Sequence, residues 1–244
     1  MADHCVFLRA GDLSAIVGDD TVRGRGGPNY SGLWSLVHDS SPASPFQGAD
    51  AGLIASTHRG TGPTLEPLDG QSARLVRGPC DRNPHATVRG TYHLVAPHYV
   101  DYTCEVEFTT DASPPEYQRH DWERRTEADR FAQQRGFPES FSGKSFDYPF
   151  YYGQLHGLVY LLMADVHSDF RFFISPSGGG YSAIPGRTSP AWDFEWLIWN
   201  PEPGQTRTLN LRLALFPPCK SALPQQVWAE WTAFCEAFPT RSSS

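Results

Sequence analysis

The chain has 244 residues, of which 39% are hydrophobic and 19% are charged, so it is long enough for one large β domain or two small domains. Its net charge of −7 and the lack of a Lys/Arg-rich run argue against a nucleic-acid-binding protein. The 22 glycines and 21 prolines favour many short strands joined by turns and argue against a long helical bundle.

The first half of the chain is predicted to form strands. Residues 6–25 have loose alternation and Gly-Asp turn signals, which predict a hairpin, and residues 30–37 form a compact apolar run typical of a buried strand. The loop-like stretch 39–70 contains one predicted short strand at 51–57. Strict alternation over 99–108 predicts a strand. One face of that strand carries Val100, Tyr102, Cys104, Val106 and Phe108.

The second half predicts a helical insertion at 114–137, further strands and an amphipathic helix at 224–238 that could cover one sheet. The predicted strands are 154–166, 169–176, 190–201 and 206–216. Together these elements predict one all-β domain over residues 1–244, mainly antiparallel, with a β-sandwich or barrel-like fold, an inserted helix and a C-terminal helix.

The cysteines and the first residues bear on the cellular compartment. Five widely spaced cysteines without a C-x-x-C pair argue against a disulfide framework or a zinc knuckle, so we predict buried free thiols. Residues 1–20 contain acids where a signal peptide needs a basic and then an apolar segment, and no apolar run approaches ~18 residues. We therefore expect a cytoplasmic protein without a membrane partner.

The segment FDYPFYYGQLHG, residues 146–157, concentrates amphipathic side chains. If a strand begins at Gln154, His156 and Tyr160 share one face, polar at its start and apolar farther along, as at the mouth of a cleft. A core histidine whose ring nitrogens are satisfied by neighbours is the alternative. The candidate ligand contacts in this segment are Asp147, Tyr148 and Tyr151, and Tyr152 is a candidate for proton transfer with His156.

A second concentration, PAWDFEWLIWN at 190–200, carries two acids two positions apart. On one strand face, Asp193 and Glu195 would lie roughly 6.5 to 7 Å apart at the backbone. Their carboxyl groups could approach the separations used in glycoside hydrolysis, about 5–5.5 Å for retention and about 6.5–9.5 Å for inversion. Acids on a solvated strand face are the alternative. Trp192 and Trp199 add rings that could stack on a sugar.

Metal and cofactor motifs are missing from the sequence. The nine histidines show no H-x-H or H-E-x-x-H spacing, so we predict no metal site, although distant histidines could still converge. His98, beside Pro97, is retained as a candidate ligand contact. The glycine loop at 175–182 lacks the lysine of a phosphate-binding loop, and no G-x-S-x-G elbow occurs, so we predict no cofactor and no serine nucleophile.

Several segments resemble those of uncharacterised bacterial β-sandwich proteins of lectin-like or concanavalin-like type. They are NYSGLWSLVH at 29–38, APHYVDY at 96–102, FDYPFYYG at 146–153, SPSGGG at 175–180 and SPAWDF at 189–194. The resemblance implies a β-sandwich with a glycan-related role and assigns no catalytic residue. Where those proteins read AGLNLEH, this chain reads AGLIAST at 51–57, so it lacks the polar pair found there.

These observations lead to a carbohydrate-active protein as the first hypothesis, with a small-molecule or oligosaccharide ligand. In a glycoside hydrolase or lyase, Glu195 or Asp193 would act as general acid or base, with His156 and Tyr152 as proton-transfer partners. A glycan-binding module without chemistry needs only the rings. A third hypothesis is a cytoplasmic enzyme or carrier for an apolar metabolite. The sequence leaves the oligomeric state open.

Overall fold

The structure is a computed structural model, and it describes most of the strands and the C-terminal helix. The described residues are 4–19, 31–42, 53–54, 63–79, 86–109, 124–125, 141–146, 148–165, 170–174, 193–196, 198, 201–219 and 221–239. Only the backbone is described for residues 53–54, 124–125, 141–146, 155, 171–174 and 193–195.

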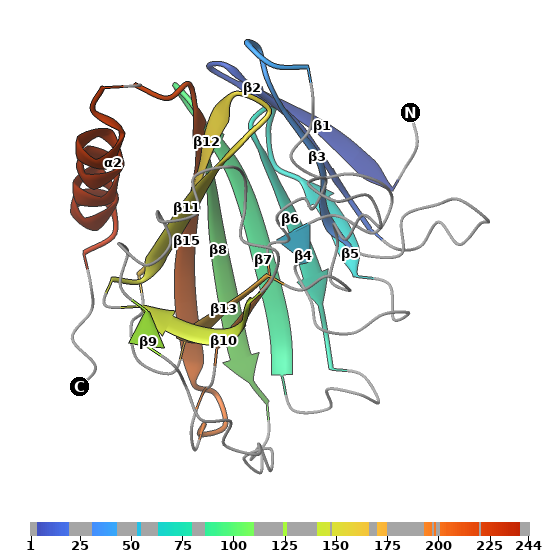
Figure 1. The fold of residues 1–244 in the computed structure, drawn as a ribbon. Helices are drawn as coiled ribbons and strands as arrows, with labels where there is room; N and C mark the ends of the chain where they lie inside the picture. The colour runs from blue at the N-terminus through green and yellow to red at the C-terminus, as the bar shows by residue number, and fades with distance from the viewer. Residues whose placement is uncertain are drawn as a thin grey trace.

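The described strands form three hydrogen-bonded sheets, mainly antiparallel (Figure 1). The first contains β1 (Cys5–Ala10), β2 (Leu13–Gly18), β3 (Gly32–His38) and β4 (Leu53–Ile54). The second runs in the order β14 (Asp193–Trp196), β13 (Phe170–Ile174), β10 (Phe141–Phe146) and β9 (Arg124–Arg125). The large third sheet has the order β11 (Phe150–Leu155), β12 (Leu158–Ala164), β15 (Thr206–Phe216), β8 (Tyr99–Phe108), β7 (Ala86–Val95), β6 (Ser72–Arg77) and β5 (Thr64–Pro67).

The main core lies between the large sheet and the first sheet, as in a sandwich. Strand β8 buries Val100, Tyr102 and Cys104 toward this core, which confirms the predicted alternation. Leu8, Leu13 and other buried apolar residues of the first sheet pack against it from the other side. Fully burying one such leucine stabilises the fold by about 1.5–3 kcal/mol, so these rows of apolar residues fix which face of each strand points inward.

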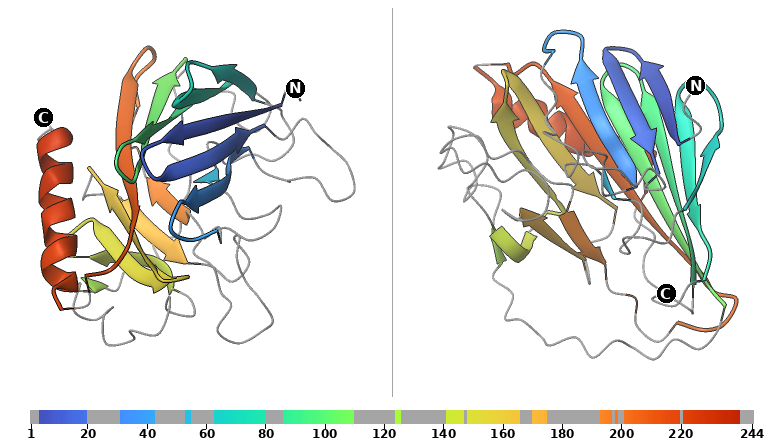
Figure 2. Two further views of the ribbon diagram at one scale, coloured as in Figure 1. Left: turned by 90° about the horizontal axis from the view of Figure 1, so that it is seen from above. Right: turned by 90° about the vertical axis from the view of Figure 1, so that its right-hand side faces the viewer.

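Helix α2 (Leu223–Ala237) covers the face of the large sheet that points away from the main core. It lies over β11, β12 and β15, as Figure 2 shows from two sides. It confirms the helix predicted at 224–238. Pro224 stands in its first turn, where a missing N–H costs no hydrogen bond. Val227 and Phe234 face the sheet. Because β12 is covered on both faces, all seven of its residues are buried.

The predicted strand at 154–166 is wrong in one respect. The chain turns at His156 and Gly157, whose φ angles are 52° and 80°, so β11 and β12 form a hairpin with a tight turn. The face that was expected to join His156 to Tyr160 therefore does not exist. Tyr160 is fully buried in the main core, whereas His156 is exposed.

The structure also bears on the predicted barrel alternative, the helical insertion and the cysteines. The large sheet is open, with β11 and β5 at its edges, so among the described strands a sandwich replaces the barrel-like alternative. The helical insertion at 114–137 lies outside the described residues, apart from the two residues of β9. Cys104 is buried as predicted, but Cys219 is exposed. Within the described ranges, no helix is long and apolar enough to cross a membrane.

Candidate functional site

Turns from different strands meet at one end of the sandwich. The Asp12 N–H donates to Pro97 O at 2.8 Å, which joins the β1–β2 turn to the β7–β8 turn. The Asp39 N–H donates to Asp12 O at 2.8 Å, and the Ser41 hydroxyl donates to His156 O at 3.3 Å. We call this group of residues the turn cluster, and it comprises Asp12, His38, Asp39, Ser40, Ser41, His98 and His156. It brings together titratable groups that lie far apart in the sequence.

A glycine makes the close approach of two turns possible. Gly11 has a φ of +52°, and a Cβ atom built on it would lie 2.3 Å from Pro97 O. A side chain there would collide with backbone atoms and would also hold a left-handed conformation that L residues avoid. The sequence Gly11-Asp12 therefore places Asp12 against the β7–β8 turn, in reach of His38.

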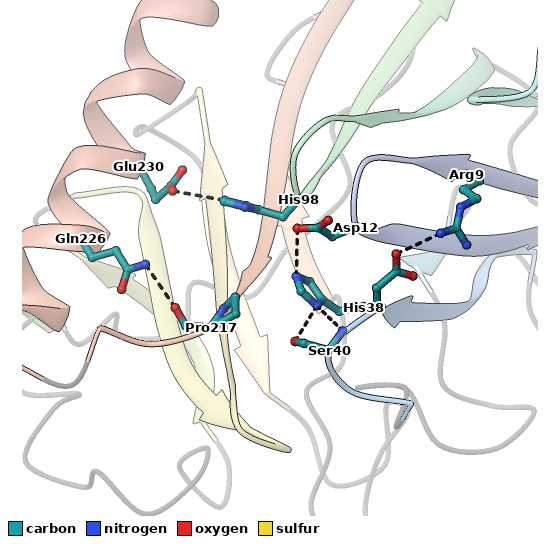
Figure 3. A network of polar contacts seen from close by, with 9 residues as sticks. Arg9, Asp12, His38, Ser40, His98, Pro217, Gln226 and Glu230 are labelled. Atoms are coloured by element: carbon teal, nitrogen blue, oxygen red, sulfur yellow. Dashed lines mark hydrogen bonds and ion pairs between the residues drawn. The ribbon is translucent and has the colours of Figure 1, made fainter.

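The titratable side chains of the turn cluster face in two directions (Figure 3). His38 Nε2 lies 3.8 Å from Asp12 Oδ2, and the two side chains are 3% and 54% exposed. On the outside, Arg9 pairs with Asp39 at 2.9 Å. His98 is turned the other way, toward α2.

Glu230 connects the turn cluster to the helix. Its Oε1 accepts from His98 Nε2 at 3.2 Å, and its Oε2 accepts from the Tyr99 hydroxyl at 2.8 Å. Desolvation raises the pKa of Glu230, but the hydrogen bonds from His98 and Tyr99 outweigh it, so the net pKa is lowered. Burial and the bond to Glu230 raise the pKa of Tyr99 to about 12. Glu230 is thus an ionised carboxylate, and it holds α2 against β8.

A buried ion pair lies beside this contact. Arg212 donates from Nε and Nη2 to the two carboxylate oxygens of Asp101 at 2.6 and 2.8 Å. Its guanidinium carbon lies 4.5 Å from the ring centre of Tyr99 and 5.4 Å from that of Phe238. Burial lowers the pKa of Arg212, while the hydrogen bond and charge of Asp101 raise it above its ordinary value. Because both partners are satisfied, this pair fixes the sheet and helix in place.

Two half-exposed rings, one of them on α2, are in contact with each other. Tyr148 and Trp228 are 43% and 44% exposed, and their rings meet edge to face with centres 5.1 Å apart. The ring of Phe150 lies behind Tyr148 at 6.0 Å, and that of Trp231 lies 5.1 Å from Phe150. We call Tyr148 and Trp228 the aromatic platform. Such rings offer apolar faces to a ligand at little entropic cost because their neighbours already hold them.

The structure separates the tyrosines that the sequence grouped together. Tyr151 faces the main core and stacks near Tyr160, with ring centres 6.1 Å apart. Tyr152 faces α2 and is 3% exposed. Tyr148 is the exposed member of the three. The alternating direction of side chains along β11 explains why neighbouring tyrosines lie in different surroundings.

The remaining predicted residues are distributed as follows. His98 lies in the turn cluster, in contact with Glu230 and near the ring of Phe216. Asp193 and Glu195 are on β14, in a different sheet from Tyr152, and their backbone alone is described. Asp147, Trp192 and Trp199 lie outside the described residues. In the part of the chain that the structure describes, no three His, Cys, Asp or Glu residues are grouped to hold a metal ion.

Sequence reasoning missed Asp12, His38, Arg212, Trp228 and Glu230. Four of these belong to segments that were correctly predicted, but periodicity shows only which face a residue occupies and not which distant residue it meets. The Gly-Asp turn signal at Gly11 was the one local sign that a sharp turn ending in an acid stood at Asp12. Trp228 could have been found as the ring that breaks the apolar spacing of the helix.

His156 occupies a position that suits asparagine or glycine better. Its positive φ costs a non-glycine residue of order 1–3 kcal/mol, and such costs gather at functional sites. We expect His156→Asn to raise the free energy of unfolding by about 0.5–1 kcal/mol, because asparagine tolerates this conformation. Urea unfolding would measure the change. His156→Val should lower stability, and a loss with asparagine would show instead that the imidazole supports the fold.

No protein-family model matches this chain, and no curated protein sequence matches it. Among solved structures, a candidate aldose 1-epimerase from Escherichia coli K12 is similar over 86% of this chain and 98% of its own, at 13% identity and a TM-score of 0.45. A heparan sulfate lyase HepC mutant from Pedobacter heparinus is similar over 88% of this chain, at 10% identity and a TM-score of 0.46. The match spans 35% of the lyase chain. Similarity at this level transfers no residue role.

Proposed function

We propose that the protein binds a carbohydrate on the aromatic platform. The observation that carries this proposal is the pair of rings, Tyr148 and Trp228, each more than two-fifths exposed and meeting at an interplanar angle of 85°. Sugars present C–H patches that pack on aromatic faces, and their hydroxyl groups need polar partners close by. Two rings at a right angle contact two sides of one sugar unit.

Polar partners are available next to the platform. On α2, Gln225 precedes Trp228 by three residues and Thr232 follows it by four, so all three share one side of the helix. Gln225 and Thr232 are exposed. The Thr232 hydroxyl donates to Trp228 O at 2.9 Å, and its oxygen can still accept from a sugar hydroxyl. Amide and hydroxyl groups around rings fit a neutral sugar.

Replacing a platform ring tests the proposal. We expect Trp228→Ala to weaken binding of the recognised glycan about tenfold or more, which corresponds to about 1.4 kcal/mol, because the stacking surface is lost. Binding is measured by calorimetry after a glycan panel has identified a ligand. Tyr148→Ala should have a similar effect.

Phe7→Ala is the matched control, because Phe7 is 62% exposed on β1 and lies outside the platform. The affinity of the Phe7→Ala variant for the glycan should equal that of the unaltered protein. The proposal fails if no glycan binds, if both platform variants bind as the parent does, or if Phe7→Ala weakens binding equally.

Acid–base catalysis on a sugar bound near the turn cluster, as in a hydrolase or lyase, is a second candidate function. It is favoured by His156 of the turn cluster, whose imidazole is exposed and whose backbone has a left-handed conformation. In this proposal His156, Asp193 and Glu195 supply proton transfer. Tyr152 would take part only after a movement of α2, which covers it. Product formation during incubation with the glycan panel would support catalysis, and binding without product would support a binding module.

A further inference from the structure

The two ring nitrogens of His38 have opposite surroundings. Nδ1 accepts the Ser40 N–H at 3.1 Å and lies 2.8 Å from Ser40 Oγ. Nε2 is buried and has no hydrogen-bond partner among the described residues; the nearest acid oxygen, Asp12 Oδ2, is 3.8 Å away. Because a backbone N–H can only donate, Nδ1 carries no proton in this arrangement. The ring is therefore the neutral tautomer with its proton on Nε2.

The charges around His38 come from three elements. Burial is the largest influence and lowers its pKa below 6.5. Asp12, from the β1–β2 turn, and Asp39, the next residue, raise the pKa, while His98, from the β7–β8 turn, lowers it. The net pKa is lowered, so the neutral ring is the form present at pH 7 and above. Half-protonation of His38 is therefore reached only below pH 6.5.

A second proton on His38 would remove a hydrogen bond from the turn. It would sit on Nδ1, so the Ser40 N–H could no longer donate there, while Ser40 Oγ, 2.8 Å from Nδ1, could accept the new proton. The same proton would give the ring a full charge next to the half-exposed Asp12 carboxylate. The charged ring thus loses the bond from the Ser40 N–H and is attracted toward Asp12. The turn 38–41 must rearrange around Ser40 when His38 is charged.

This turn links the two sheets of the sandwich. His38 ends β3, and the Ser41 N–H donates to His38 O at 2.8 Å. Ser41 in turn donates through its hydroxyl to His156 O, in the β11–β12 turn of the large sheet. We propose that protonation of His38 opens the 38–41 turn and releases the Ser41 contact with the His156 turn, so that this end of the sandwich acts as an acid-sensitive latch.

The pH dependence of the 38–41 turn follows from the pKa of His38 in the closed and in the opened turn. In unfolded or opened chain, His38 takes up a proton near pH 6.5, whereas in the closed turn it does so only at lower pH. The closed turn is therefore fully stable above pH 6.5 and loses stability as the pH falls through the lower value. The carbohydrate proposal plays no part in this inference.

Nuclear magnetic resonance of the intact protein between pH 8 and pH 5 tests the latch. We expect His38 to titrate below pH 6.5, with loss of hydrogen-exchange protection at the Ser40 and Ser41 amides over the same range after correction for intrinsic exchange. His38→Gln removes the titrating group, so protection in this variant should not change with pH.

His93→Gln is the matched control, since His93 is an exposed histidine on β7, and it should retain the full pH response. The inference is overturned if His38 titrates at or above pH 6.5, if Ser40 stays protected after His38 is protonated, or if His38→Gln keeps the response. The titration of His38 and the protection of the Ser40 amide in the unaltered protein test the latch even where a variant does not fold.

Discussion

Asp101→Ala is expected to lower the free energy of unfolding by about 3–5 kcal/mol, because it leaves the Arg212 charge buried without its partner. The two side chains are only 14% and 9% exposed, so water cannot replace the lost carboxylate. The guanidinium also packs on Tyr99 and near Phe238, and its displacement would loosen the contact between β8 and α2. Urea unfolding followed by tryptophan fluorescence measures the change.

The same chain offers a control pair on its surface. Arg89 and Glu107 form an ion pair at 2.8 Å with exposures of 33% and 42%, so Glu107→Ala should cost about 1 kcal/mol or less. The double variant Asp101→Ala/Arg212→Met should recover much of the loss, since it removes the unpaired charge. Equal costs for Asp101→Ala and Glu107→Ala would show that the buried pair is no more important than a surface one.

Gly11→Ala is expected to lower the free energy of unfolding through two separate effects. The left-handed backbone costs a residue with a side chain about 1–2 kcal/mol, and overpacking typically adds about 1–3 kcal/mol. The added Cβ would lie 2.3 Å from Pro97 O and 2.8 Å from Pro97 C, which are backbone atoms that cannot rotate away. The β1–β2 turn must move, so the amide signals of Asp12 and Asp39 should shift as well.

Two other glycines separate these effects. Gly204 has a φ of +77° but no atom within 4 Å of its Cβ position, so Gly204→Ala should show the backbone cost alone. Gly78 has neither a positive φ nor a close neighbour, and Gly78→Ala should leave stability unchanged or raise it by about 0.4–1 kcal/mol. If Gly11→Ala costs no more than Gly204→Ala, the close approach of the two turns is not what constrains this position.

The strands and the helix could be predicted where one face of an element is buried and the other is not. Strand β8 alternates because Val100 and Tyr102 face the main core while Asp101 lies on the other face of the sheet, and α2 shows the spacing of a helix covered on one side. Strand β12 has no such contrast, since both of its faces are buried. The long apolar run after Gly157 led the hairpin at His156 to be interpreted as a continuous strand, although the turn itself consists of a histidine and a glycine.

The candidate site was less predictable than the fold. Tyr148 and His98 were predicted as ligand contacts, because polar-tipped rings beside turn residues are visible in the sequence. Their partners Trp228 and Glu230 lie more than 75 and 130 residues away, respectively, and no local pattern reports a contact across that separation. The role of His38 depends on which of its nitrogens meets the Ser40 N–H, which only coordinates can show.

The position of β15 has a consequence for how the chain assembles. This strand lies between β8 and β12, although it follows both in sequence, and it pairs Arg212 with Asp101 across 111 residues. Until it inserts, β8 and β12 each present an unpaired row of backbone N–H and C=O groups. Translation must therefore produce residues 206–216 before the large sheet becomes continuous. Until then the β11–β12 pair and the β5–β8 strands remain separate, and each has an exposed edge that can pair with another chain.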